Sequence, residues 1–274
     1  MYPVIHLGPL NIGTHGVVDL IGGIIVLVGA IYRVRTGRWP VSIYDVFNIA
    51  PYMLLGATLG AWLVSLLPRA VAYAMGASLP PMWWLKGRDW AGMMVGGSLV
   101  GYVYCRRRNL DLSQCFDLVA PLVPLYIAIY RVGCLLAGCC YGKETTSWPS
   151  LFLPDIRGVW AYRYPTRIAD IIASLLILAL LLTFERYRIK RRDEDWPFSG
   201  FLFLLYLGLY SVQRFYFEFW RAETHKLVGP FTWTHLYCLI GVSLATWGIV
   251  RGWRREKEGK SDMRRAKCPR EFDT

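Results

Sequence analysis

Residues 166–184 read TRIADIIASLLILALLLTF, a run in which apolar side chains follow one another almost without interruption. An apolar run of about 18 residues or more is long enough to cross the roughly 30 Å of hydrocarbon in a bilayer as a helix. Working outward from this run, further apolar stretches occur at 16–33, 46–67, 90–105, 115–133, 198–217 and 230–250. The sequence therefore predicts an all-α integral membrane protein, a bundle of about seven transmembrane helices.

The composition supports this fold class. Hydrophobic residues make up 55% of the chain and aromatic residues 15%, and the mean hydropathy is +0.33, which is too apolar for the surface of a soluble domain of this length. The N-terminus lacks a basic segment, and no small-residue cleavage site follows the first span, so we expect this span to stay in the membrane. We predict one transmembrane domain over residues 1–253 and a disordered, basic cytoplasmic tail over residues 254–274.

The net charge of +12 is distributed in a way that indicates topology. Most of the 31 basic residues follow the first, third, fifth and seventh spans, at 33–38, 106–108, 186–192 and 251–270. Because Lys and Arg accumulate on the cytoplasmic side, the N-terminus is predicted outside and the C-terminus in the cytoplasm. These basic segments carry no nucleic-acid-binding motif, so we expect the lipid bilayer and not a nucleic acid as their partner.

Residues 130–142, YRVGCLLAGCCYG, combine a membrane-depth arginine with several glycines. Arg131 offers a planar fork of donors, and Gly133, Gly138 and Gly142 leave backbone N–H groups accessible, a combination suited to phosphate. The alternative is close helix packing by small residues. The buried charge of Arg131 favours the functional interpretation.

Residues 210–221, YSVQRFYFEFWR, place a second group of charges at the end of a span. Helical spacing puts Arg214 and Glu218 on one face, with Tyr210 one turn earlier. Such a pair can simply neutralise itself and hold two helices together. Arg221, three residues beyond Glu218, adds a positive charge that favours an anionic ligand.

Arg163 and Arg167 flank the start of the span at 166–184, where Pro165 suits the first turn of a helix. The predicted topology puts both arginines outside, on the face that the positive-inside bias depletes. They therefore indicate a function more strongly than the cytoplasmic arginines do.

His15 begins the first span and has two open interpretations, a packing residue or a group for proton transfer. We expect His225 and His235 to lie at the membrane interface. The four histidines are dispersed and the seven cysteines lack paired C-x-x-C spacing, so no metal site and no cofactor is predicted. A disulfide from Cys134 to one of its neighbours stays open.

Several short blocks occur in the order seen in one known family. They are the N-terminal segment 4–9, the glycine-rich stretch 92–101, FDLVAPLVP at 116–124, the segment 131–142, YPTR at 164–167 and the arginines and glutamate of 214–221. In these blocks, from about Pro3 to Val250, the chain resembles the bacterial prolipoprotein diacylglyceryl transferase family.

The resemblance implies transfer of a diacylglyceryl group from phosphatidylglycerol to the lipobox cysteine thiol of a secreted prolipoprotein, with release of glycerol phosphate. It also implies a multi-pass protein of the bacterial inner membrane. Arg131 and Arg214 would stabilise the departing phosphate, Glu218 would hold Arg214, and His15 would accept a proton. The residues expected to bind substrate are Gly133, Gly138, Tyr141, Gly142, Asp117, Tyr210, Arg221, Arg163 and Arg167.

The chain also departs from the family pattern. Val95 stands where the resemblance places a histidine, and Cys134 and Cys139 stand for an Asn and a Glu, while Tyr164 and Arg167 replace a His and a Gln. Three alternatives follow: His15 substitutes for the missing base, the thiol ionises without it, or the chain acts on another acceptor. A non-catalytic protein that binds or transports anionic lipids is the remaining interpretation.

Overall fold

A computed structural model describes residues 4–7, 10–37, 39, 41–76, 90–190, 197–222 and 226–267. His225, considered above, and Cys268, one of the seven cysteines, lie outside the described residues. The described chain is mostly helical, as predicted. Its helices are α1 (Thr14–Thr36), α2 (Ile43–Ala74), α3 (Trp90–Arg107), α4 (Leu112–Val119), α5 (Leu122–Ala137), α6 (Thr166–Lys190), α7 (Phe201–Glu218) and α8 (Trp233–Lys267).

Five helical stretches of the described residues are long and apolar enough to cross a membrane. They are Thr14–Thr36, Ile43–Ala74, Leu112–Ala137, Thr166–Tyr187 and Trp233–Glu258. α3 and α7 coincide with the two other predicted spans. Large apolar side chains such as Leu20 and Leu176 are about two thirds exposed, which suits a surface that faces lipid.

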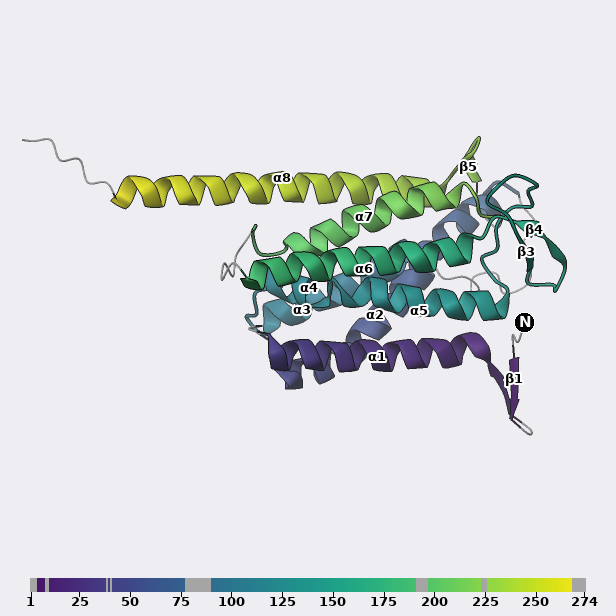
Figure 1. Cartoon of the computed structure of the whole chain (residues 1–274), viewed down its shortest axis with the longest axis horizontal. Coiled ribbons are helices and arrows are strands. Elements are labelled where there is room, and N and C mark those ends of the chain that lie inside the picture. The colour runs from purple at the N-terminus through teal and green to yellow at the C-terminus, as the bar shows by residue number, and fades with distance from the viewer. Residues whose placement is uncertain are drawn as a thin grey trace, which may run out of the picture.

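Three short antiparallel hairpins complete the fold: β1 (Val4–Leu7) with β2 (Leu10–Gly13), β3 (Leu151–Pro154) with β4 (Trp160–Arg163), and β5 (Lys226–Val228) with β6 (Phe231–Thr232). β1, β3, β4 and β5 all lie at one end of the helices, here called the strand end, while the long α8 projects from the opposite end (Figure 1). The strand end is therefore where the start of α6 meets the ends of α5 and α7.

The helices approach one another closely where their side chains are small. A Cβ added at Gly60 or Gly96 would meet the backbone of the facing helix, so α2 and α3 pack backbone to backbone. Between α6 and α7 the core is apolar and aromatic, with Leu181, Tyr206 and Tyr210 almost completely buried. The charged residues Arg131, Arg214 and Glu218 lie between this core and the strand end.

The span predicted at 115–133 is confirmed by the apolar stretch Leu112–Ala137. It is divided into α4 and α5 at Ala120 and Pro121, because a proline has no N–H with which to continue the helical ladder. One sequence prediction about the helices is wrong. The tail predicted to be disordered from residue 254 is helical as far as Lys267. Its charges alternate in sign at helical spacing, for example Arg254 and Glu258, and such pairs support a solvated helix.

Candidate functional site

An ion pair joins α5 to α6 near the strand end. Nε of Arg131 lies 2.9 Å from Oδ2 of Asp170, and the two side chains are only 8% and 4% exposed. The other carboxylate oxygen of Asp170 accepts a hydrogen bond from the amide of Gln213 in α7, at 3.2 Å. The carboxylate therefore fixes the Arg131 guanidinium and ties three helices together.

A second group of charges lies where α7 ends. Arg214 Nη2 is 2.9 Å from Oε2 of Glu218, as the helical spacing predicts, and Arg221 Nη1 is 3.6 Å from the same oxygen. The hydroxyl of Thr232, just before α8, donates to Oε1 of Glu218 at 3.2 Å. One buried carboxylate thus holds two arginines.

These groups leave an excess of positive charge inside the protein. Arg131, Arg214 and Arg221 act on one another electrostatically, whereas only Asp170 and Glu218 pair with them here. Nε and Nη1 of Arg214 and Nε of Arg221 are buried without a hydrogen-bond partner among the described residues. Burial, together with the neighbouring Arg214 guanidinium, lowers the pKa of Arg221. Because buried donors are normally satisfied, this arrangement favours an added anion.

The glycines of the segment 130–142 have structural roles. Gly138 ends α5 in a left-handed conformation, with φ of 82°, which a residue with a Cβ adopts only at a cost. A Cβ at Gly133 would press on Val18 of α1, and one at Gly142 would collide with the backbone carbonyl of Tyr164. Close packing therefore accounts for Gly133 and Gly142, and backbone conformation accounts for Gly138.

Arg163 braces the loop between α5 and α6. Its Nη2 lies 2.8 Å from Glu144 and 3.5 Å from Asp155, and its guanidinium lies 4.9 Å from the ring centroid of Tyr141. A hydrogen bond from the backbone N–H of Val159 is the main cause that lowers the pKa of Asp155. Arg163 thus holds this loop together, and the backbone carbonyl of Tyr141 accepts a hydrogen bond from the N–H of Ala222, which follows Arg221.

Arg167 is almost completely buried and donates to backbone carbonyls. Its partners are the carbonyls of Cys134 and Leu135, each at 3.4 Å, and of Pro154 at 3.0 Å. A cation that binds the last carbonyls of α5 also suits the negative end of that helix dipole. Arg167 therefore positions the end of α5 against the loop.

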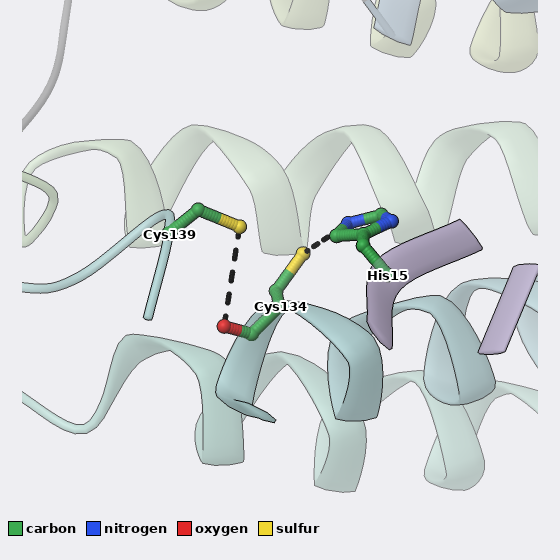
Figure 2. Close-up of side chains that lie close together, drawn as sticks. All are labelled: His15, Cys134 and Cys139. Atoms are coloured by element: carbon green, nitrogen blue, oxygen red, sulfur yellow. Dashed lines mark hydrogen bonds between the residues drawn. The ribbon is translucent and has the colours of Figure 1, made fainter. Parts of the chain in front are cut away.

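His15, Cys134 and Cys139 form a group of imidazole and sulfur side chains that lie close together (Figure 2), and Cys134 interacts electrostatically with Arg131. His15 Nδ1 is 3.1 Å from Oδ2 of Asp19, and its Nε2 is 3.5 Å from Sγ of Cys134. The thiol of Cys139 donates to the Cys134 carbonyl at 3.9 Å. The described cysteines are all free thiols. His15 Nε2 or Nδ1 and the two sulfur atoms lie within 4.8 Å of one another, a set of possible ligands that the sequence spacing did not predict.

Cys140 lies next to this group, in a turn with a positive φ of 59°. Its carbonyl accepts from the hydroxyl of Thr166 at 3.2 Å. Hydrogen bonds from the thiols of Cys134 and Cys139, and then the charge of Arg221, lower the pKa of Cys140. The cysteines therefore connect His15 to the arginines.

Three residues considered in the sequence analysis differ in their relation to the charged groups. The carboxylate of Asp117 accepts from the N–H groups of Gly200 and Phe203, and so caps the start of α7. At 1.5 Å per residue, that point is about 20 Å along the helix from Arg214, so Asp117 does not join the site. Tyr210 is 1% exposed in the core between α6 and α7, and its hydroxyl interacts with the Arg131 guanidinium, so it lies with the charged groups. His235 is buried, at 2% exposure, and its Nδ1 accepts from the N–H of Thr232.

The site also contains residues that the sequence prediction missed. Asp170 and Asp19 are the partners of Arg131 and His15, and Thr232 is a partner of Glu218. Both aspartates interrupt long apolar runs, and charge within a membrane span is the signal that pointed to Arg131. Thr232 is uncharged, so the sequence gave no comparable indication of its role.

The model of the family "Prolipoprotein diacylglyceryl transferase" matches residues 3–251. The chain belongs to this family. Among curated prolipoprotein diacylglyceryl transferases, it is 36% identical to that of Clostridium tetani over 140 residues, which is 48% of this chain and 51% of the relative. It is 33% identical to that of Gloeobacter violaceus over 178 residues, 61% of this chain and 64% of the relative.

A longer match is less similar. The phosphatidylglycerol–prolipoprotein diacylglyceryl transferase of Dehalococcoides mccartyi is 27% identical over 257 residues, 92% of this chain and 94% of the relative. The matches of higher identity span about half to two thirds of the length of those prolipoprotein diacylglyceryl transferases.

Proposed function

We propose that this chain is a phosphatidylglycerol-dependent transferase, which moves a diacylglyceryl group to the lipobox cysteine thiol of a prolipoprotein. The observation that carries the proposal is the buried excess of positive charge formed by Arg131, Arg214 and Arg221 against Asp170 and Glu218. Membership of the prolipoprotein diacylglyceryl transferase family supports it, because the relatives named above bear that activity in their names.

In this proposal the arginines bind the phosphate diester of phosphatidylglycerol. The unpartnered Nε and Nη1 atoms of Arg214 and Nε of Arg221 are donors for the phosphate oxygens. The acceptor thiolate attacks the glyceryl carbon, the C–O bond to phosphate breaks, and the electron pair leaves with glycerol phosphate. Fixed positive charge stabilises the negative charge that develops on this leaving group, and Asp170 and Glu218 keep the guanidiniums in position.

His15 contributes an imidazole side chain to this site. Its Nδ1 is held by Asp19, which leaves Nε2 as the atom that faces the cysteines. The acceptor thiol has to lose its proton before or during the attack, and His15 is the described side chain placed to assist.

The membrane arrangement is part of the proposal. All predicted spans cross the inner membrane of a bacterium, seven in total, with the strand end outside and the end of α8 in the cytoplasm. Both substrates, the phospholipid and the secreted precursor, are then available at the strand end, and the phospholipid enters laterally between helices. The basic residues at and just beyond the ends of α1, α3 and α6, and those in the second half of α8, support this orientation.

The test is lipidation of a reporter prolipoprotein by purified variants. Arg131→Ala and Arg214→Ala should each lower the rate about 100-fold or more, because each removes a charge that stabilises the leaving group. Arg106→Ala is the matched control, since Arg106 is exposed at the far end of α3 and should leave the rate unchanged. Membrane insertion of each variant is checked in parallel.

Two results would reject the proposal. Full activity of both arginine variants would show that these charges do not serve the reaction. Bound phosphatidylglycerol without release of glycerol phosphate, for any thiol acceptor offered, would leave lipid binding or transport as the function. Release of glycerol phosphate with a small thiol but not with a lipobox peptide would show a different acceptor.

A further inference from the structure

The group formed by His15, Cys134 and Cys139 has the chemistry and the dimensions of a metal site. One nitrogen and two sulfur atoms lie within 4.8 Å of one another, and the measured separation of His15 Nε2 and Cys134 Sγ is 3.5 Å. In a tetrahedral zinc site with bonds of about 2.0 to 2.3 Å, ligand atoms lie about 3.5 to 3.8 Å apart. The separation of His15 Nε2 and Cys134 Sγ already has this value, and the other ligand atoms lie within 4.8 Å.

A second observation concerns the far side of the imidazole. Oδ2 of Asp19 lies 3.1 Å from His15 Nδ1 and Nε2 faces Cys134, so a neutral imidazole that donates from Nδ1 to Asp19 would direct its Nε2 lone pair toward Cys134. A carboxylate that orients a histidine in this way is the usual support of a metal-binding imidazole. The ring is held further by an edge contact with Tyr130, with centroids 4.6 Å apart.

We propose that His15, Cys134 and Cys139 bind a thiophilic divalent cation, Zn²⁺, through one imidazole nitrogen and two thiolates. Thiolate and imidazole ligands select zinc over the hard cations Mg²⁺ and Ca²⁺. Two thiolates balance the charge of the ion, so it adds no net charge beside the buried arginines. The carboxylate of Asp19 adds negative charge behind the imidazole.

The set provides three protein ligands, and catalytic zinc sites keep the fourth position for water or substrate. Cys140 is not part of the set that lies within 4.8 Å. His15 and Asp19 remain 27% and 23% exposed, which leaves the site accessible to a substrate from outside the core.

Resting on the proposed function, we assign the fourth position to the acceptor thiol. A thiol that binds zinc loses its proton, here to water, and stays nucleophilic as a thiolate. Its sulfur then forms the C–S bond as the C–O bond to phosphate breaks, and the phosphate leaves toward the arginines. In this arrangement His15 assists the loss of the thiol proton through the metal that it binds and does not itself accept the proton, and the reaction needs no histidine at the position of Val95.

The test begins with metal content, which is independent of transferase activity. The full-length protein is purified in detergent under reducing conditions, incubated with zinc, dialysed and analysed by plasma mass spectrometry. We expect one equivalent of zinc per chain, and a thiolate-to-cobalt absorption band after replacement by Co²⁺. Cys134→Ser and Cys139→Ser should lose the metal, and Asp19→Asn should weaken it about 10-fold to 100-fold.

Matched controls separate the ligands from the other thiols. Cys115→Ser removes a thiol remote from this group and should keep the full zinc content. Cys140→Ser should also keep it, whereas loss of zinc in this variant would show a closed four-ligand site and overturn the open position. Unfolding curves of every variant identify those that fail to fold.

Other outcomes overturn the metal site itself. Substoichiometric zinc in the reduced protein, or zinc retained when Cys134 and Cys139 are both replaced by serine, would reject it. A Cys134–Cys139 disulfide that forms as readily in the presence of zinc as in its absence would do the same. Zinc binding without any lipid turnover would reject the proposed function only, while equal turnover of zinc-free and zinc-loaded protein would reject the activating role of the metal.

Discussion

Removal of the carboxylate of Asp170 should destabilise the protein strongly, because it leaves the guanidinium of Arg131 buried and without its counter-charge. At 2.9 Å and an effective dielectric constant of about 20, the two charges attract each other by about 6 kcal/mol before desolvation is counted. Breaking a buried pair by deleting one partner costs about 3–5 kcal/mol. The amide of Gln213 also loses its acceptor, which adds about 1 kcal/mol.

The expected result for Asp170→Ala is therefore a loss of about 4–6 kcal/mol in the free energy of unfolding. The double variant Arg131→Met with Asp170→Leu removes both charges and should recover most of this loss, since apolar replacements of a buried pair are often neutral or stabilising. The double variant should nevertheless be inactive, because it lacks one of the arginines assigned to the phosphate. This combination separates the structural role of the pair from its role in the reaction.

The assay is equilibrium unfolding in detergent, followed by tryptophan fluorescence, with the lipidation rate measured on the same preparations. Asp170→Asn serves as the matched variant, because it keeps an acceptor for Gln213 and removes only the charge. If Asp170→Ala unfolds at the same denaturant concentration as the parent, the pair is not buried as described. If the double variant is both stable and fully active, the assignment of Arg131 to the phosphate is wrong.

Three further substitutions test the packing. Asp117→Ala should lose about 1–3 kcal/mol of stability at the start of α7 but leave the lipidation rate of the folded fraction unchanged; a large fall in that rate would restore Asp117 to the substrate site. Gly142→Ala should expose the loop between α5 and α6 to limited proteolysis, whereas Gly23→Ala, with open space around it, should resist cleavage as the parent does. Gly96→Leu should push α2 from α3 and lower the unfolding temperature, and an unchanged temperature would contradict the close approach to Gly56.

The sequence was sufficient to locate most of the long apolar helices and to predict the charge pair within α7. Apolar run length predicts the spans, and the spacing of Arg214 and Glu218 predicts their contact, because helix geometry alone sets both. Contacts between distant segments could not be predicted in this way. Arg131 and Asp170 come from different helices, and His15 and Cys134 are separated by 119 positions, so no local spacing records either contact.

The roles of single residues were hardest to predict where a charged side chain hydrogen-bonds to the backbone or holds a loop. Arg163 and Arg167 are predicted to bind substrate, and the structure adds that they hold a loop and the end of α5, contacts that their positions in the sequence could not indicate. The hairpins were missed because strands of two to four residues carry no periodic pattern that distinguishes them from a loop.

The length of α8 has a practical consequence for labelling. At 1.5 Å per residue, its 35 residues extend for about 52 Å, so about 20 Å of helix cannot fit within roughly 30 Å of hydrocarbon. A fluorescent protein fused to the C-terminus would be held clear of the bilayer by this helical spacer. Such a fusion should leave the strand end unobstructed, and it offers a handle for counting subunits in single-molecule experiments.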